Sequence, residues 1–227
     1  MGQLSVRTFR QRSSIPVYVV ADLSASMGFR GQVSKMGLLA DLTSAVARSA
    51  TRCGDRFGFV GCDSQIREDW SLSLRLHKDG AAEWCARLGT FVPERARSHL
   101  GFGAAAGHLG RQRALVFLVS DFHYPMDSLI AVLDSLGRHD VVPVVLWDRA
   151  EYERLPSWGL TRVGDPETGG KRLLFMRPRL KLQFSERFIR RRAELTDQCS
   201  QRGRPPFFLV DRFNADALTD YFLSGSG

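Results

Sequence analysis

Apolar positions along this chain of 227 residues alternate between compact runs and segments with helical spacing. The run PVYVVAD at 16–22 is apolar without alternation, which is typical of a strand buried on both faces. Directly after a second run, the segment IREDWSLSL alternates and predicts an antiparallel edge strand at 66–74. The other runs predict strands at 55–64, 113–121, 140–148 and 205–211.

The segments between these runs predict helices. Asp79 is a good N-cap and Gly89 lies just past the end of one short helix. Strands and helices therefore alternate, which predicts an α/β fold with a mostly parallel sheet. No G-x-G-x-x-G or Walker A lysine motif follows the first strand, which excludes the dinucleotide-binding and P-loop versions of such a fold. The other helices are expected at 33–52, at 100–109, after Pro125, at 180–202 and at 216–222.

The pattern changes after about residue 150. Turn signals such as Gly164-Asp165-Pro166 and Gly169-Gly170 predict a short β excursion before the basic helix at 180–202. The chain shows no internal repeat and no low-complexity linker. We therefore expect a single domain over 1–227, with a core at about 14–150 and a C-terminal elaboration at about 151–227.

Composition narrows the class of protein. The chain is 44% hydrophobic and 25% charged, which is average for a globular protein, and no apolar run reaches the roughly 18 residues of a membrane span. The N-terminal basic residues are not followed by the apolar region of a secretory signal. The four cysteines form no C-x-x-C pair and are expected to be reduced core thiols, which favours a cytoplasmic location.

Two of the buried runs end in an acid, and this marks a candidate site. Asp22 and Asp121 follow the first strand and the strand at 113–121, and the carboxyl ends of neighbouring parallel strands are where open α/β sheets bind ligands. Ser24 and Ser26 stand just after Asp22, and Ser98 could approach from a third loop. These oxygen donors suit Mg²⁺, and so few charged ligands would leave room for a carboxylate from a partner.

These motifs carry a resemblance to a known family. Asp-x-Ser-x-Ser after a buried strand resembles the metal-ion-dependent adhesion site of von Willebrand factor A domains. The ordered set of DLSASMGF, CGDRFGFVGCD, LVFLVSDF and LPSWGLTRVGDPETG is similar to a bacterial family, domain of unknown function 58, that accompanies MoxR-type AAA+ ATPases. Within it, the chain is similar to the MxaS-type proteins of methanol-oxidation clusters.

The resemblance implies a fold, a metal site and a role. The fold would be a von Willebrand factor A-like (Rossmann-like) three-layer sandwich. Asp22, Ser24 and Ser26 match the first metal loop and Asp121 the third, while Arg97-Ser98-His99 replaces the usual Gly-Gly-Thr of the second. The implied function is a non-enzymatic protein-binding module with weakly bound Mg²⁺ or Mn²⁺, whose partner is a MoxR-type ATPase or the client that it remodels. An acidic residue of the partner would complete the metal site.

Other interpretations remain open. The first loop could be an Asx- or Ser-capped turn, and Asp121 could cap the next helix. A Mg²⁺-dependent phosphotransferase or phosphatase with Asp22 as nucleophile is the enzymatic alternative, although such enzymes have a second Asp where this chain has Ser24. The basic character also allows nucleic-acid binding, but no RNP-type or helix-turn-helix motif supports it.

The positive charge is concentrated in one segment. Residues 171–204 hold eleven Lys and Arg against three acids, which equals the net charge of +8. Arg187, Arg190 and Arg191 are the candidate partner-binding residues, because the arginine fork binds carboxylates or phosphates in a bidentate manner. A solvated helix face is the plain alternative. The helix is expected to turn Leu182, Phe188, Ile189 and Leu195 inward.

Overall fold

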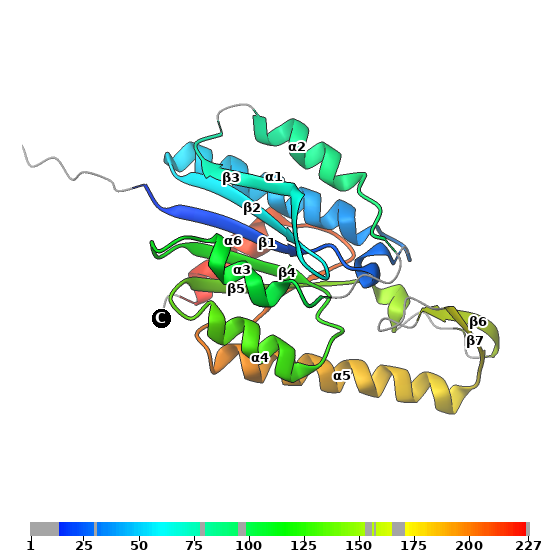
Figure 1. The fold of residues 1–227 in the computed structure, drawn as a ribbon. Helices are drawn as coiled ribbons and strands as arrows, with labels where there is room; N and C mark the ends of the chain where they lie inside the picture. Colours follow the sequence, from blue (N-terminus) through cyan, green and yellow to red (C-terminus); the bar gives the residue numbers. More distant parts are fainter. Residues whose placement is uncertain are drawn as a thin grey trace, which may run out of the picture.

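The computed structural model describes residues 14–29, 31–77, 80–94, 99–152, 156, 158–164 and 171–225. A six-stranded sheet lies between two layers of helices, and a separate two-stranded hairpin projects to one side (Figure 1). The strand order is β3-β2-β1-β4-β5-β8, and β2–β3 is the antiparallel pair in an otherwise parallel sheet. The predicted α/β fold and the edge strand are thereby confirmed. The strands are β1 Pro16–Asp22, β2 Arg56–Cys62, β3 Ile66–Arg75, β4 Leu115–Ser120, β5 Asp140–Trp147 and β8 Phe207–Val210.

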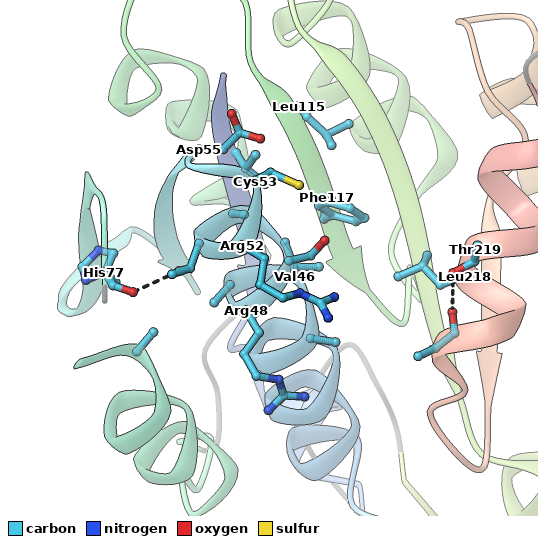
Figure 2. A pocket seen from close by; sticks show the side chains of 18 of the residues that line it. Val46, Arg48, Arg52, Cys53, Asp55, His77, Leu115, Phe117, Leu218 and Thr219 are labelled. Atoms are coloured by element: carbon cyan, nitrogen blue, oxygen red, sulfur yellow. Dashed lines mark hydrogen bonds between the residues drawn. The ribbon is translucent and has the colours of Figure 1, made fainter. Parts of the chain in front are cut away.

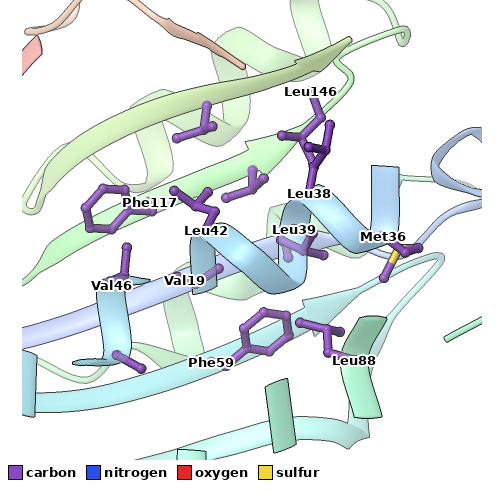
Figure 3. Close-up of a cluster of buried hydrophobic side chains, with 14 of the residues drawn as sticks. Val19, Met36, Leu38, Leu39, Leu42, Val46, Phe59, Leu88, Phe117 and Leu146 are labelled. Carbon is purple, nitrogen blue, oxygen red and sulfur yellow. The ribbon is translucent and has the colours of Figure 1, made fainter. Parts of the chain in front are cut away.

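The helices divide between the two faces of the sheet according to which strand residues they cover. The odd-numbered residues of β1 pack against α1, α2 and α6, and the even-numbered residues pack against α3, α4 and α5. Figure 3 shows the first of these cores, where Leu39 and Leu42 of α1 are fully buried over Val19. The helices are α1 Lys35–Cys53, α2 Gly80–Gly89, α3 Phe102–His108, α4 Met126–Ser135, α5 Pro178–Ser200 and α6 Ala215–Ser224.

The order of the strands reverses between β1 and β4. From β1 the chain moves outward through β2 to β3, and it then returns to the other side of β1 with β4, β5 and β8. Ligands of open α/β sheets bind at this kind of reversal, at the carboxyl ends of the strands. The fold therefore places the ends of β1 and β4, with Asp22 and Asp121, side by side at the expected position.

The segment after residue 150 does not stay apart from the core. A hairpin of β6 (Gly159–Gly164) and β7 (Lys171–Met176) comes first, and α5 then leads back to β8, which extends the central sheet beside β5. Pro143 lies in β5, which is an interior strand, although proline within a sheet is usually confined to edge strands. Its pairing with β8 begins only at Val144, one residue after the proline, which limits the consequence of the missing donor.

The prediction that all four cysteines are core thiols is confirmed only in part. Cys62, Cys85 and Cys199 are buried free thiols as expected, but Cys53 is exposed at the end of α1, so its assignment to the core is wrong.

Within the described part of the chain, no helix combines the length and the apolar character that a membrane crossing requires.

Candidate functional site

The site at the carboxyl ends of the strands is built around two fully buried carboxylates. The Ser120 hydroxyl at the end of β4 donates to Asp22 Oδ2 across 2.7 Å, and this bond joins the two strand ends directly. Asp22 Oδ1 accepts from the backbone N–H of Ser24 at 2.8 Å. Asp22, Ser120 and Asp121 are all buried, with no exposed surface as residues. Asp22 and Asp121 were predicted at this position from the sequence, whereas Ser120 was not.

The first loop holds its two serines close together. The Ser24 and Ser26 hydroxyl oxygens lie 3.3 Å apart, at the start of the short 3-10 helix η1 (Ala25–Gly28). The Ser24 N–H bond to Asp22 is also the bond of an Asx-type turn, so the capped-turn interpretation describes part of this geometry. Ser98, the predicted hydroxyl of the second loop, and its neighbour Arg97 lie outside the described residues.

Asp121 has a partner that the sequence analysis did not foresee. The Lys35 ammonium lies 2.9 Å from Asp121 Oδ2 and 2.6 Å from Glu151 Oε1, and the lysine is fully buried. Asp121 Oδ1 accepts from the N–H of His123 at 3.2 Å. Because α4 begins at Met126 after Pro125, Asp121 does not cap that helix. One sequence signal existed: Lys35 opens α1 at the helix end where the macrodipole disfavours a cation.

A fourth acidic group, Asp148, fixes Glu151 and the chain before α1. Asp148, at the end of β5, forms a capping box with Glu151 in the short helix η2 (Arg149–Glu151). Asp148 Oδ2 accepts from the backbone N–H groups of Gln32 and Val33 at 2.8 and 3.2 Å. Gly31 lies so close that a Cβ there would stand 2.3 Å from Asp148 Oδ2. The ends of β1, β4 and β5 are thus tied into one polar network.

The two aspartates have opposite electrostatic environments. Burial and the negative charge of Asp121 raise the pKa of Asp22 to about 6. Burial alone would also raise the pKa of Asp121, but the Lys35 ammonium and His123 outweigh it and hold that pKa below its ordinary value. Burial favours the neutral form of Lys35, yet Asp121 and Glu151 keep its pKa above the usual value. Lys35 is therefore charged and Asp121 is ionised at neutral pH.

A half-buried histidine, His99, and a buried tyrosine, Tyr124, border the same site. The His99 and Tyr124 rings stack with centroids 4.1 Å apart. Within the described residues, His99 Nε2 and the Tyr124 hydroxyl are buried and make no hydrogen bond of normal geometry. Burial, followed by Asp22 and Asp121, raises the pKa of Tyr124 well above its ordinary value. The pair leaves two polar atoms that a water or a ligand group can satisfy.

The backbone after Asp121 is strained and is held by α5. Phe122 has a φ of 50°, a left-handed conformation that is unfavourable for a bulky residue. The Arg191 guanidinium donates to the Phe122 carbonyl at 2.8 Å and also to the Tyr124 carbonyl. The side chain of Arg191 is only 20% exposed. Its donors are therefore directed at this loop rather than at the solvent.

The rest of α5 presents a mixed outer face. Arg187 and Arg190 are exposed, as the partner-binding hypothesis requires. Leu195 is buried and Phe188 packs against Trp147, but Leu182 and Ile189 are 63% and 71% exposed. The expectation that these last two face inward is wrong, because the helix contacts the body along a narrower stripe than the periodicity suggested.

The residues fit a divalent cation only in part. Two ligands at right angles around Mg²⁺ lie about 3.0 Å apart, which is close to the Ser24–Ser26 hydroxyl separation. Asp121, however, is already neutralised by Lys35. Among the described residues, no group of three or more His, Cys, Asp or Glu side chains could hold a metal ion. The part of the site formed by Asp22, Ser24 and Ser26 suits a weakly held ion, whereas Asp121 is already paired with the Lys35 ammonium.

A pocket elsewhere in the molecule is distinct from this site. It lies between the C-terminal half of α1 and α6, and the first residues of β1 and β4 line it (Figure 2). Val17 and Leu115 mark it as belonging to the amino ends of the strands. It therefore lies at the opposite ends of the strands from Asp22 and Asp121, and Asp55 is the one acid among its described lining residues.

Comparisons with known proteins agree with the fold. A crystal structure of the conserved hypothetical protein BatB from Bacteroides thetaiotaomicron superposes with a TM-score of 0.54 at 11% identity, covering 94% of this chain and 99% of that one. An aerotolerance-related membrane protein from Bacteroides fragilis gives a TM-score of 0.53 at 11% identity, covering 93% and 98%. These likenesses show a von Willebrand factor A-like three-layer fold.

The sequence comparisons identify the family. An uncharacterized protein in the moxR 3' region of Paracoccus denitrificans is 34% identical over 101 residues, which is 44% of this chain and 96% of that protein. The family described as "Protein of unknown function DUF58" matches residues 1–194. The chain therefore belongs to the DUF58 family, as its ordered motifs predicted.

Proposed function

We propose that this chain is a non-enzymatic protein-binding module that acts with a MoxR-type AAA+ ATPase or with the client of that ATPase. The observation that carries the proposal is the convergence of Asp22, Ser24, Ser26 and Asp121 at the strand-order reversal. The moxR-region relative supports the choice of partner. The buried free thiols of Cys62, Cys85 and Cys199 fit a reducing compartment, so we place this role in the cytoplasm.

The proposed mode of binding uses a weakly held Mg²⁺ or Mn²⁺ ion. Asp22, Ser24 and Ser26 would hold it, with Ser98 as a further hydroxyl and Asp121 behind them. When bound, such an ion supplies positive charge to a carboxylate of the partner. The chain itself orients Asp22 through the Ser120 hydroxyl and the Ser24 N–H, and it shields both aspartates from bulk water.

Metal titration tests this mode. We expect calorimetry to show Mg²⁺ or Mn²⁺ binding at about 10⁻³ M or weaker, because the site offers few charged ligands. Asp22→Ala should abolish the signal by removing the carboxylate nearest the serines. Asp41→Ala, an exposed aspartate on α1, is the matched control and should leave the signal unchanged. Equal binding by wild type and Asp22→Ala would remove the metal from the proposal.

The outer face of α5 is the second proposed contact. Exposed Leu182 and Ile189 stand among exposed arginines, and a surface that mixes apolar side chains with arginine suits a protein partner with acidic groups. A phosphate-binding face would gain nothing from the two apolar side chains. We therefore assign Arg187 and Arg190 to the protein partner, with Arg191 contributing through the loop that it supports.

Charge reversal on α5 tests this second contact. Arg187→Glu combined with Arg190→Glu should weaken binding to the partner ATPase or client by at least about 10-fold, because two favourable charge pairs become repulsive. Arg48→Glu combined with Arg52→Glu makes the same change in net charge on the opposite helical layer and should have little effect.

The readout is an affinity measured for both double variants at one ionic strength. Undiminished binding by the Arg187/Arg190 variant would leave α5 as a solvated face. Wild type should bind duplex DNA no tighter than the roughly 10⁻⁴–10⁻⁶ M non-specific range at physiological salt. Nanomolar DNA binding would instead assign the arginines to nucleic acid.

A further inference from the structure

Lys35 is a fully buried lysine at the centre of the strand-end site, and the proposed binding role gives it no task. Lysine is almost never fully buried unless it is paired. Here the ammonium contacts two carboxylates, at 2.9 Å from Asp121 and 2.6 Å from Glu151. The Phe29 ring lies 5.6 Å from the same nitrogen, which adds a cation–π contact.

The surrounding structure holds this ammonium in place from three strand ends. The β1 side supplies Phe29 and the chain that leads into α1, the β4 side supplies Asp121, and the β5 side supplies Glu151. Asp148 fixes Glu151 through the capping box and fixes the N–H groups of Gln32 and Val33. Three segments that are distant in sequence, which carry Phe29, Asp121 and Glu151, are therefore arranged around one cation.

Burial makes this cation costly to remove. A buried charge that loses its partner is strongly destabilising, because the remaining charge has neither water nor a counter-ion. Without Lys35, Asp121 would be stranded beside Asp22 in a site that excludes solvent. Among the described residues, the His123 ring also lies close by, with its Nε2 3.7 Å from Glu151 Oε2.

We propose that the Lys35 ammonium is the resident cation of the strand-end site, which neutralises Asp121 and Glu151 so that the site is stable without a divalent ion. A metal then has only the Asp22, Ser24 and Ser26 side available and binds weakly. This inference uses the same site as the proposed function and assigns the positive charge there to the chain itself.

The proposal predicts that removing the lysine charge makes the site dependent on metal. Lys35→Met keeps the length and the apolar stem of the side chain but leaves two unbalanced carboxylates. We expect its thermal midpoint to fall in EDTA and to rise by at least about 5 °C in about 10 mM MgCl₂, since ligand binding to the native state raises stability. Its Mg²⁺ affinity should exceed that of wild type by at least about 10-fold, because a positive charge beside the ligands is gone.

Two further proteins complete the experiment on the full chain. Wild type and Lys181→Met, the same substitution on α5, should show equal rises between EDTA and MgCl₂, both smaller than that of Lys35→Met, because both keep the same weak affinity for the ion. Lys35→Met combined with Asp121→Asn removes the cation together with one carboxylate. It should fold without metal, and its response to Mg²⁺ should be no larger than that of wild type.

The outcomes separate the proposal from its alternatives. A Lys35→Met protein that is as stable as wild type in EDTA, or that is weakened without recovering in Mg²⁺, would overturn it. If Lys35→Met does not fold, the double variant decides: recovery of the fold supports a charge-balancing lysine, and failure to fold overturns the proposal. Because no ATPase is present in these measurements, a wild type that binds no ATPase would end the proposed function and leave this result intact.

Discussion

Replacing Arg191 by methionine is expected to lower the free energy of unfolding by about 2–4 kcal/mol. The guanidinium donates to the carbonyls of Phe122 and Tyr124, and methionine leaves both acceptors in a partly buried position without a donor. Hydrogen bonds from a charged donor contribute about 1.5–3 kcal/mol each, and an unsatisfied buried acceptor adds to the loss. Phe122 also loses the contact that stabilises its left-handed backbone.

Arg190→Met is the matched control for this prediction. Arg190 is the neighbouring residue on the same helix and is exposed, so its substitution should change stability by less than about 0.5 kcal/mol. Urea unfolding of the two variants and wild type gives the comparison. Because Asp121 immediately precedes Phe122, Arg191→Met should also weaken the metal signal at the strand ends. Equal stability of the two variants would mean that α5 does not support the loop.

Gly101→Ala is expected to cost about 1–3 kcal/mol, because the start of α3 has no room for a methyl group. A Cβ at this position would stand 2.6 Å from the backbone of Gln65 and 2.7 Å from the Asp63 carbonyl oxygen. That same oxygen accepts from the Gly101 N–H at 2.7 Å. Backbone atoms cannot rotate away as a side chain can, so α3 and the β2–β3 turn must separate.

Gly103→Ala, two residues further along, is expected to have the opposite sign. A Cβ there meets no atom within 4 Å, and alanine is better than glycine in a helix by about 0.5–1 kcal/mol. Thermal or urea unfolding of both variants checks the pair. If both substitutions were stabilising, the close approach of α3 to the β2–β3 turn would be contradicted.

Much of the fold could be predicted because local pattern and burial agree along most of the chain. Non-alternating apolar runs predicted the parallel strands to within a few residues, and the alternating 66–74 segment predicted the antiparallel edge. The predictions that were wrong concern which side of a helix faces the core, because tertiary packing decides this. The helical spacing predicted that Leu182 and Ile189 face the core. In the structure α5 packs on the core through Phe188 and Leu195, and Leu182 and Ile189 are exposed.

The sequence by itself determined the strands, the order of the motifs, the family and the placement of Asp22 and Asp121 at strand ends. Only the tertiary structure decided which side chains complete the site. Ser120 reaches Asp22 across 98 residues of chain, Lys35 reaches Asp121 across 86, and Arg191 reaches Phe122 across 69. Each is a single polar residue whose role depends on strand order and on the direction of one side chain. Neither property leaves a periodic signal in the sequence, whereas burial of a whole strand repeats over many residues and therefore does.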